Sequence, residues 1–289
     1  MMSTIHNRNR GIGNRMRRMF FTIVVCLVVA WIVWLGLILL FQETFIFPRF
    51  IANRDVPASA PADVEILRIA LDDGGFVESW LLPPIGTTPA PLLVIAHGNA
   101  ERIDSWIDFA RRQQQRGYAV LLPEYRGYGL SGGSPTQQDL VDDTIRFVDQ
   151  VHARNDVDAD RTGYLGMSIG TAVLAQVALE RAPRGIVMLV PPARIDSFLW
   201  RFAAPSFMMR HPFRTDLAVQ QLDLPILICS NTRDHIIPHD HGRRLDELAI
   251  DSTYMEFDGD HNVLHSDAEV LRRRRAMDGF LDGLLEPGR

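Results

Sequence analysis

The longest hydrophobic stretch of the chain lies near its N-terminus. The run FFTIVVCLVVAWIVWLGLILLF, residues 20–41, contains no charged side chain. At about 1.5 Å of rise per residue, a helix of this length measures roughly 33 Å and can cross a bilayer core. Five arginines lie within residues 8–18, whereas only Arg49 and Arg54 follow the run closely. The positive-inside rule therefore predicts a transmembrane signal anchor, preceded by an arginine-rich cytoplasmic tail over residues 1–19.

A cleaved signal peptide is the main alternative to an anchor. Such a peptide has a shorter apolar region and small residues at its cleavage site, whereas this run ends in the bulky LILLFQETF. A buried core helix without a polar face fits less well. We expect the rest of the chain to be extracytoplasmic, on the periplasmic side if the membrane is a bacterial inner membrane. Trp31 and Trp34 fall mid-span, so they should face lipid or contact another element.

Residues 42–61 contain three prolines and are predicted to form a linker. The pattern of hydrophobic and polar residues changes after it. Residues 64–71 and 76–82 alternate in polarity around DDGG, which predicts a β-hairpin. The continuous apolar runs PLLVIAHGN and YAVLLPEY are typical of strands buried on both faces of a sheet. Further strands are expected at 162–166, from 185, at 225–230 and at TYMEF, with helices at 102–116, 137–152, 171–181, 239–248 and 267–285.

Strands that alternate with helices predict an α/β protein with one doubly wound, mostly parallel sheet. The entry hairpin adds an antiparallel edge, and the domain should cover residues 62–289. The alternation stops over residues 191–222, where SFLWRFAAPSFMMRHPF is rich in aromatic residues and methionine. This insertion is interpreted either as a short cap that lines an apolar pocket or as packing over the sheet edge.

Composition and charge exclude several classes of protein. Hydrophobic residues make up 47% and charged residues 22%, as in ordinary globular proteins. The net charge of −5 argues against nucleic acid as a partner. All 30 basic residues are arginine, which excludes a Walker A loop, a Schiff-base lysine and a Ser–Lys dyad. The two cysteines, Cys26 and Cys229, allow neither a disulfide framework nor a cysteine-based zinc site.

The pattern G-x-S-x-G, typical of a nucleophilic serine on a sharp turn, occurs twice. GMSIG, around Ser168, is entered by the strand pattern TGYLG and left by the helical pattern IGTAVLAQVALE. GLSGG, around Ser131, follows YRGYG and precedes a further proline, which is loop composition. We therefore predict Ser168 as the nucleophile and Ser131 as a loop residue.

A serine nucleophile needs a base and an acid that orients the base, in the chain order Ser, acid, His for this motif. Asp234 follows the strand pattern PILICS, and His261 follows TYMEF. Both should lie at the carboxyl edge of the sheet, where Ser168 also lies. His261 would take the serine proton, and Asp234 would hold the imidazole. The rival acids are Asp223, Asp258 and Asp260.

An oxyanion hole needs two backbone N–H donors. We expect one from Ile169, next to the nucleophile, and one from Asn99, in the loop after PLLVIAHGN that His97 and Gly98 shape. Histidines also gather within residues 235–241 and recur in DHNVLH. Without companion cysteines or an H-E-x-x-H motif they are interpreted as loop residues, so neither metal nor cofactor is expected.

The stretches IAHGNAERI, LLPEYRGYGLSGGSP, GYLGMSIGTAV, PILICSNTRDHIIPHDHGRRL and DGDHNVL resemble, in order and spacing, the α/β-hydrolase-domain family and its single-span membrane-anchored branch. The resemblance covers about residues 63–285 and the apolar helix. It implies a serine hydrolase with Ser168, Asp234 and His261 as its triad. Asp260 departs from the family pattern, where a small residue often precedes the histidine, and an acid there could shift the protonation of His261.

Members of that family include esterases, lipases, depalmitoylases and aminopeptidase-like proteins, so the substrate does not follow from the resemblance. We expect a membrane-anchored enzyme that cleaves carboxylic esters or thioesters of small or lipid-like molecules. A serine peptidase on the same triad is the alternative. A catalytically silent hydrolase fold that acts as a binding module fits less well. The oligomeric state stays open.

Overall fold

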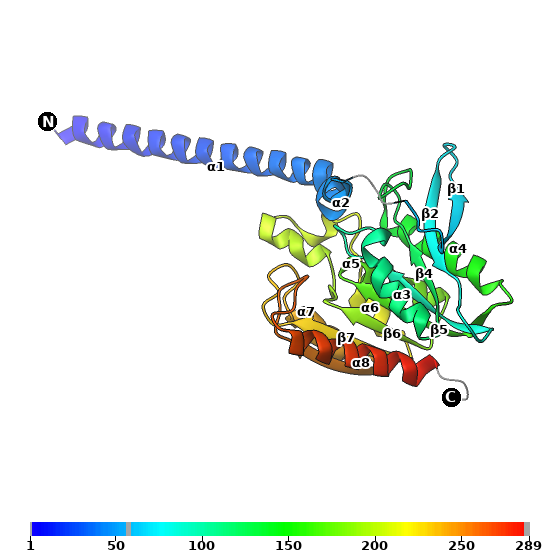
Figure 1. Ribbon diagram of the computed structural model, residues 1–289. Helices are drawn as coiled ribbons and strands as arrows, with labels where there is room; N and C mark the ends of the chain where they lie inside the picture. Colours follow the sequence, from blue (N-terminus) through cyan, green and yellow to red (C-terminus); the bar gives the residue numbers. More distant parts are fainter. Residues whose placement is uncertain (1, 56–58, 286–289) are drawn as a thin grey trace.

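The hydrophobic runs of the C-terminal part fold into one central sheet (Figure 1). The computed structural model describes residues 2–55 and 59–285, and within them eight strands pair in the order β1-β2-β4-β3-β5-β6-β7-β8. β1 and β2 form the predicted antiparallel hairpin, β2 is antiparallel to β4, and the later neighbours are parallel. The predicted fold class is therefore confirmed. The strands are β1 (Glu65–Ala70), β2 (Phe76–Leu82), β3 (Ala90–Ala96), β4 (Ala119–Pro123), β5 (Val157–Met167), β6 (Gly185–Leu189), β7 (Pro225–Asn231) and β8 (Asp251–Phe257).

Helices cover both faces of the sheet because successive side chains of a strand point to opposite faces. In β4, Leu121 belongs to one buried hydrophobic cluster, whereas Val120 and Leu122 belong to the other. The first cluster lies under α4 (Gln137–His152), α5 (Ile169–Glu180), α6 (Thr215–Val219) and α7 (Asp240–Leu248). The second lies under α3 (Ile107–Gln115) and α8 (Asp267–Leu285).

The element bounds differ from the predicted ones most informatively at three places, and by one or two residues at several others. The helix expected from residue 102 starts as a 3₁₀ turn, η1 (Ile103–Trp106), before α3. The strand expected at 162–166 is the end of the longer β5, which begins at Val157. The helix expected from residue 171 begins at Ile169, directly after the turn residue Ser168.

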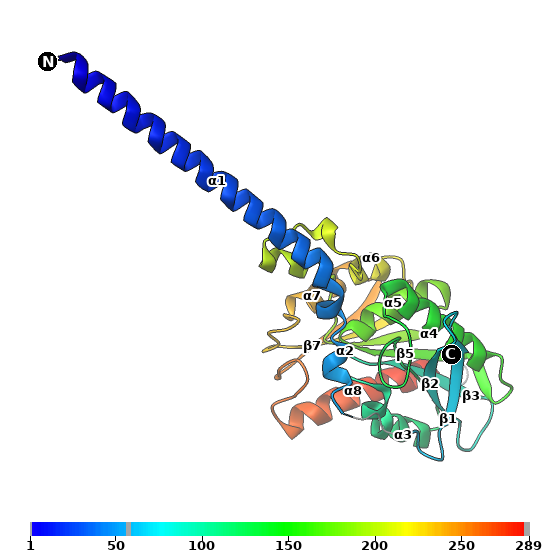
Figure 2. The same ribbon diagram turned by 90° about the horizontal axis from the view of Figure 1, so that it is seen from above.

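Helix α1 (Met2–Ile46) extends away from the sheet domain in both views (Figures 1 and 2). Within the described residues it is the one helix long and apolar enough to cross a membrane, with a mean hydropathy of 3.1 in its most apolar window. None of that window is buried. These are properties of a membrane anchor and equally of an N-terminal signal sequence. Residues 2–19, predicted as a tail, continue the helix, and Met1 lies outside the described residues.

The predicted linker is folded against the domain over much of its length. α1 continues to Ile46, and α2 (Arg49–Ala52) follows after Pro48. Phe47 is buried and makes an edge contact with Phe213, with ring centroids 6.1 Å apart. The end of the apolar helix is thereby held on the domain. Residues 56–58 of the predicted linker, and 286–289 of the predicted hydrolase domain, lie outside the described residues.

The insertion over residues 191–222 forms η2 (Asp196–Phe202), η3 (Ser206–Met208) and α6. We call residues 191–222 the cap. The cap leaves the sheet after β6 and returns at β7. Its 3₁₀ turns, drawn in yellow-green, lie beside the C-terminal half of α1 in both views (Figures 1 and 2).

Candidate active site

Ser168 stands alone between a strand and a helix. β5 ends at Met167 and α5 begins at Ile169, so Ser168 forms the whole turn. Its backbone angles, φ 51° and ψ −120°, lie in a region that residues with a side chain rarely adopt. The N–H of Ser168 donates to Leu189 O at 2.9 Å, which ties the turn to β6. Such a turn presents the hydroxyl at the carboxyl edge of the sheet.

The two glycines of GMSIG are required by close backbone approach. A Cβ on Gly166 would lie 2.6 Å from Thr171 Cα. A Cβ on Gly170 would lie under 3.0 Å from the carbonyl oxygen of Ala96, in the neighbouring strand β3. Only residues without a side chain allow strand and helix to meet this closely. The spacing of the motif therefore has a steric cause in this chain.

Ser168, His261 and Asp234 meet in one hydrogen-bonded row. His261 Nε2 lies 3.1 Å from Ser168 Oγ, and His261 Nδ1 lies 2.6 Å from Asp234 Oδ2. Asp234 is buried, and its Oδ1 accepts hydrogen bonds from the N–H groups of Ile236 and Ile237, both at 2.8 Å. With one carboxylate oxygen held by the backbone and the other on Nδ1, the imidazole presents Nε2 to the serine.

The rival acids face other partners. Asp258 pairs with Arg233 at 2.9 Å, and Asp223 is exposed. The carboxylate of Asp260 lies 3.1 Å from His265 Nε2, so the residue that departs from the family pattern faces His265 rather than His261. Asn231 also fixes this loop, because its Nδ2 donates to Asp260 O at 2.6 Å.

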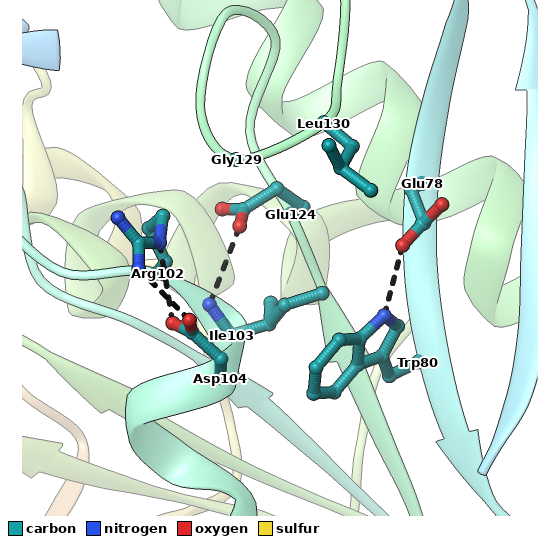
Figure 3. A pocket seen from close by; sticks show the side chains of 8 residues that line it. All are labelled: Glu78, Trp80, Arg102, Ile103, Asp104, Glu124, Gly129 and Leu130. Carbon is teal, nitrogen blue, oxygen red and sulfur yellow. Dashed lines mark hydrogen bonds and ion pairs between the residues drawn. The ribbon is translucent and has the colours of Figure 1, made fainter. Parts of the chain in front are cut away.

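Ser131, the second motif match, lies in the loop after β4. It is buried, and its Oγ accepts a hydrogen bond from the N–H of Glu78 at 3.0 Å. The same loop borders a small pocket between β2 and η1 (Figure 3). In this pocket Glu78 Oε1 accepts from Trp80 Nε1 at 2.9 Å, and Glu124 Oε2 accepts from Ile103 N at 3.3 Å. The cavity of about 10 Å³ holds a single water at most, so it is no substrate site.

The loop after β3 faces the elbow. Asn99 and Ile169, the two predicted oxyanion donors, both line the cavity that contains Ser168. Ile169 is the first residue of α5, where helix N–H groups have no partner within the helix. The side chain of Asn99 accepts from Tyr128 Oη at 3.0 Å and donates to Ile46 O, at the end of α1.

A buried ion pair beneath this loop is a feature that the sequence patterns did not identify. His97 Nε2 lies 2.7 Å from Glu124 Oε1, and both side chains are almost wholly buried. Tyr125 Oη donates to His97 O at 2.9 Å. Burial lowers the pKa of His97, but the charge and contact of Glu124 and the Gly98 carbonyl outweigh it and raise that pKa above its ordinary value. The available signal was the histidine of IAHGN together with the glutamate of LLPEY, each directly after an apolar run.

A cavity of about 700 Å³ opens over Ser168 and His261. Its size is that of small-molecule binding sites. Phe198 and Leu199 of the cap line one side, so the insertion borders the pocket. The C-terminal half of α1 lines another side, which the hydrophobic pattern did not predict. The polar Gln42 near the end of the apolar run was the available signal: its Oε1 accepts from Arg210 N in the cap at 2.9 Å.

One histidine of the group at residues 235–241, His241, has partners of its own in the cap. His241 Nδ1 accepts from Ala193 N at 3.1 Å, and its ring stacks on Phe198 with centroids 5.2 Å apart. Burial, and to a smaller degree the charge of Arg201, lowers the pKa of His241. It is therefore part of the support under the cap.

Comparisons with known proteins agree with this fold. The family described as serine aminopeptidase, S33, matches residues 87–213. YfhR of Escherichia coli (strain K12) is 26% identical over 238 residues, which cover 78% of this chain and 84% of YfhR. The lysophosphatidylserine lipase ABHD12 of Rattus norvegicus is 25% identical over 202 residues. The match covers 61% of this chain and 50% of the length of ABHD12.

Among solved structures, acetyl xylan esterase 1 from Thermoanaerobacterium superposes with a TM-score of 0.61 at 15% identity. The match covers 83% of this chain and 93% of the esterase. Fold and elbow thus define an α/β hydrolase. The comparisons support an α/β-hydrolase-domain family for this chain.

Proposed function

We propose that this hydrolase cleaves carboxylic esters or thioesters through an acyl-enzyme on Ser168. The observation that carries the proposal is the row Ser168 Oγ, His261 Nε2 and Nδ1, Asp234 Oδ2, with separations of 3.1 and 2.6 Å. A serine hydroxyl is a weak nucleophile, and a base within hydrogen-bond reach that is itself held by a carboxylate is what activates it.

The reaction follows from these contacts. Ser168 Oγ attacks the acyl carbon while its proton moves to His261 Nε2, and Asp234 stabilises the imidazolium that results. His261 then gives that proton to the leaving alcohol or thiol. A water enters, loses a proton to His261 and releases the acid from the acyl-enzyme. The N–H groups of Ile169 and Asn99 would hold the oxyanion in both steps.

The cavity favours an acyl group of some length. Its walls include Phe198, Leu199 and Ile195 of the cap and Ile38 of α1. Apolar walls of this kind stabilise a hydrocarbon chain by removing it from water. The likeness to a lysophosphatidylserine lipase supports a lipid-like substrate. α1 would anchor the enzyme in a membrane, with the N-terminus cytoplasmic and the catalytic domain outside.

A serine peptidase on the same residues is the second candidate, because the matched family is described as serine aminopeptidase. The two candidates share Ser168 and differ in the leaving group. Turnover of p-nitrophenyl esters against aminoacyl-nitroanilides separates them, and we expect the esters to be preferred.

Labelling with a fluorophosphonate tests the common step. Wild type should be labelled and Ser168→Ala should not. Ser131→Ala is the matched control, since Ser131 bonds to the backbone of Glu78, and it should be labelled like wild type. Equal labelling of wild type and Ser168→Ala would leave a binding module as the better interpretation. Loss of labelling in a folded Ser131→Ala protein would reverse the choice of nucleophile.

A further inference from the structure

We propose that the tip of the cap lies within the membrane leaflet beside α1, and that the cavity takes its substrate, an acyl glycerolipid, sideways from that leaflet. The inference rests on the proposed function, because it names the substrate class of the same site. We call residues 199–208 the cap tip.

Helix α1 forms part of the substrate cavity. Trp34, Ile38, Gln42 and Phe45 all line it, together with Ser168. They are spaced by three or four residues, so they lie on one face of the helix. The opposite face is exposed, with Leu40 at 70%. If α1 spans the membrane, a ligand in the cavity contacts both the transmembrane helix and Ser168.

Two tryptophans fasten the cap tip to α1. Trp31 Nε1 donates to Ala203 O at 3.0 Å, and Trp34 Nε1 donates to Phe202 O at 2.8 Å. These carbonyls end the turn η2, where the chain turns through Ala203 at φ 51°. In water such carbonyls would be solvated, but in hydrocarbon each needs a protein donor. An indole N–H that is removed from water likewise needs a hydrogen-bond acceptor. The pairing therefore satisfies both partners at membrane depth.

The position of these bonds along α1 places the cap tip in the membrane. Trp31 precedes Phe41, the end of the apolar run, by ten residues, or about 15 Å of helix. This is about half of a hydrocarbon core of roughly 30 Å. The cap contacts α1 on this stretch, so an α1 that spans the bilayer carries the cap tip into one leaflet.

The outer surface of the cap tip suits lipid. Trp200, Phe202 and Phe207 are 72%, 54% and 88% exposed, within eight residues of the chain and next to the two hydrogen bonds to α1. Three large aromatic side chains exposed so close together in the sequence are unusual on a face that meets water. Arg201 is the single charge within the cap tip; it lines the cavity rather than the outer surface alone, and its Cζ lies 5.1 Å from the Phe198 ring centroid.

This arrangement matches the orientation of a lipid in a bilayer. The acyl chain of a glycerolipid points into the core, and its ester lies near the interface. Residues of α1 and the cap line one part of the cavity, and Ser168 lines another, at the carboxyl end of β5. A lipid could therefore reach the cavity from the leaflet beside α1 without turning over. A cavity of about 700 Å³ fits a lipid-sized molecule better than a polypeptide.

The first experiment places a larger side chain on the α1 side of the cavity. The full chain with Ile38→Trp is reconstituted in phosphatidylcholine vesicles that contain monopalmitoylglycerol, and p-nitrophenyl acetate is assayed in parallel. We expect lipid hydrolysis to fall roughly tenfold or more, as steric changes in apolar pockets do, and to fall much further than acetate turnover. Leu40→Trp, on the exposed face, is the matched control and should change neither rate.

The outcomes separate this inference from the proposed function. Equal loss of lipid and acetate turnover in Ile38→Trp, or no loss of either, contradicts the α1 wall while fluorophosphonate labelling still supports the enzyme. Absence of labelling and of all turnover in wild type removes the proposed function itself. A palmitoyl-thioester peptide cleaved much faster than monopalmitoylglycerol would overturn the glycerolipid class.

The second experiment measures how deeply the cap tip lies in the membrane. In a Cys26→Ser background, Phe207→Cys or Gln150→Cys is labelled with an environment-sensitive fluorophore in vesicles with nitroxides on the lipid acyl chains. Gln150 lies on α4, away from α1 in both views (Figures 1 and 2). The label at 207 should be quenched and the label at 150 should not. Equal, weak quenching at both positions, in protein that still reacts with fluorophosphonate, would contradict insertion of the cap.

Discussion

The backbone of Ser168 holds a strained conformation because β5 ends at the residue before it and α5 begins at the residue after it. The φ of 51° is tolerated since Gly166 and Gly170 let β5, α5 and β3 meet at van der Waals distance. The row to His261 and Asp234 then depends on single side chains, each fixed by one or two hydrogen bonds. At this scale a change of one atom should have a measurable effect.

Replacement of Gly170 tests the steric account of the motif. Gly170→Ala places a methyl group against the Ala96 carbonyl and should destabilise the protein by about 2 kcal/mol or more. Gly279→Ala is the control, because a Cβ there meets nothing within 4 Å inside α8, and it should stabilise by about 0.5–1 kcal/mol. Thermal unfolding of the full chain in detergent measures both. Equal shifts for the two variants would refute the close approach.

Replacement of Asp234 tests which acid orients the base. Asp234→Asn keeps the shape but loses the charge and favours the wrong imidazole tautomer, so kcat on p-nitrophenyl butyrate should fall about 10⁴-fold. Asp260→Asn should stay within a few-fold of wild type, since Asp260 faces His265. If Asp260→Asn proves the more damaging, the assignment of the acid is wrong.

The loop after β3 is held in place by the segment that follows β4. His97, Tyr125 and Tyr128 link it to the segment after β4 through an ion pair and two hydrogen bonds. The loop carries Asn99, the proposed oxyanion donor, so its geometry depends on a neighbouring strand end rather than on its own sequence. The His97–Glu124 pair also couples this element to pH.

The sign of that coupling follows from the direction of the shift. The pKa of His97 is raised in the folded chain above its unfolded value of about 6.5. Its stabilisation is therefore fully present below pH of about 6.5 and is lost as pH rises through the folded pKa. Glu124→Gln should cost about 3 kcal/mol at pH 6 and flatten this loss.

Chemical denaturation between pH 6 and pH 9 measures the effect. His152→Gln serves as a comparison, because burial lowers the pKa of His152 and its contribution has the opposite sign. Parallel pH profiles for wild type and Glu124→Gln would mean that the pair does not titrate in this range.

At the scale of the whole molecule, the apolar helix and the domain form a connected unit. Asn99 and Gln42 bond the end of α1 to the loop after β3 and to the cap, and Arg210 pairs with Glu43 at 3.1 Å. A membrane at α1 would thereby set the orientation of the active site. The side of the membrane on which the site lies then depends on the arginines before the span.

A reporter at the C-terminus tests the orientation. Alkaline phosphatase fused after residue 289 should be active in a bacterial host, and a fluorescent protein that folds only in the cytoplasm should be dark. Replacing Arg15, Arg17 and Arg18 by glutamine should weaken this bias, because the asymmetry of basic residues directs insertion. Phosphatase inactivity with wild-type arginines would show that the domain is cytoplasmic.

Much of the fold could be predicted because its signals are local. Apolar runs bounded by turns identified the strands, and the predicted mostly parallel sheet is confirmed. GMSIG was separable from GLSGG because a strand enters one and not the other. The roles of Ser168, Asp234 and His261 stay predictions until activity is measured, although His261 lies within hydrogen-bond reach of both Ser168 and Asp234.

The sequence by itself determined the apolar helix, the sheet and the elbow, since periodicity and backbone sterics act over a few residues. Only the tertiary structure decided that residues 42–53 fold onto the domain and that Asp260 turns toward His265. It also decided that Trp31 bonds to the cap, 172 residues further along the chain. Contacts between distant segments depend on how whole elements pack, and no local pattern encodes that.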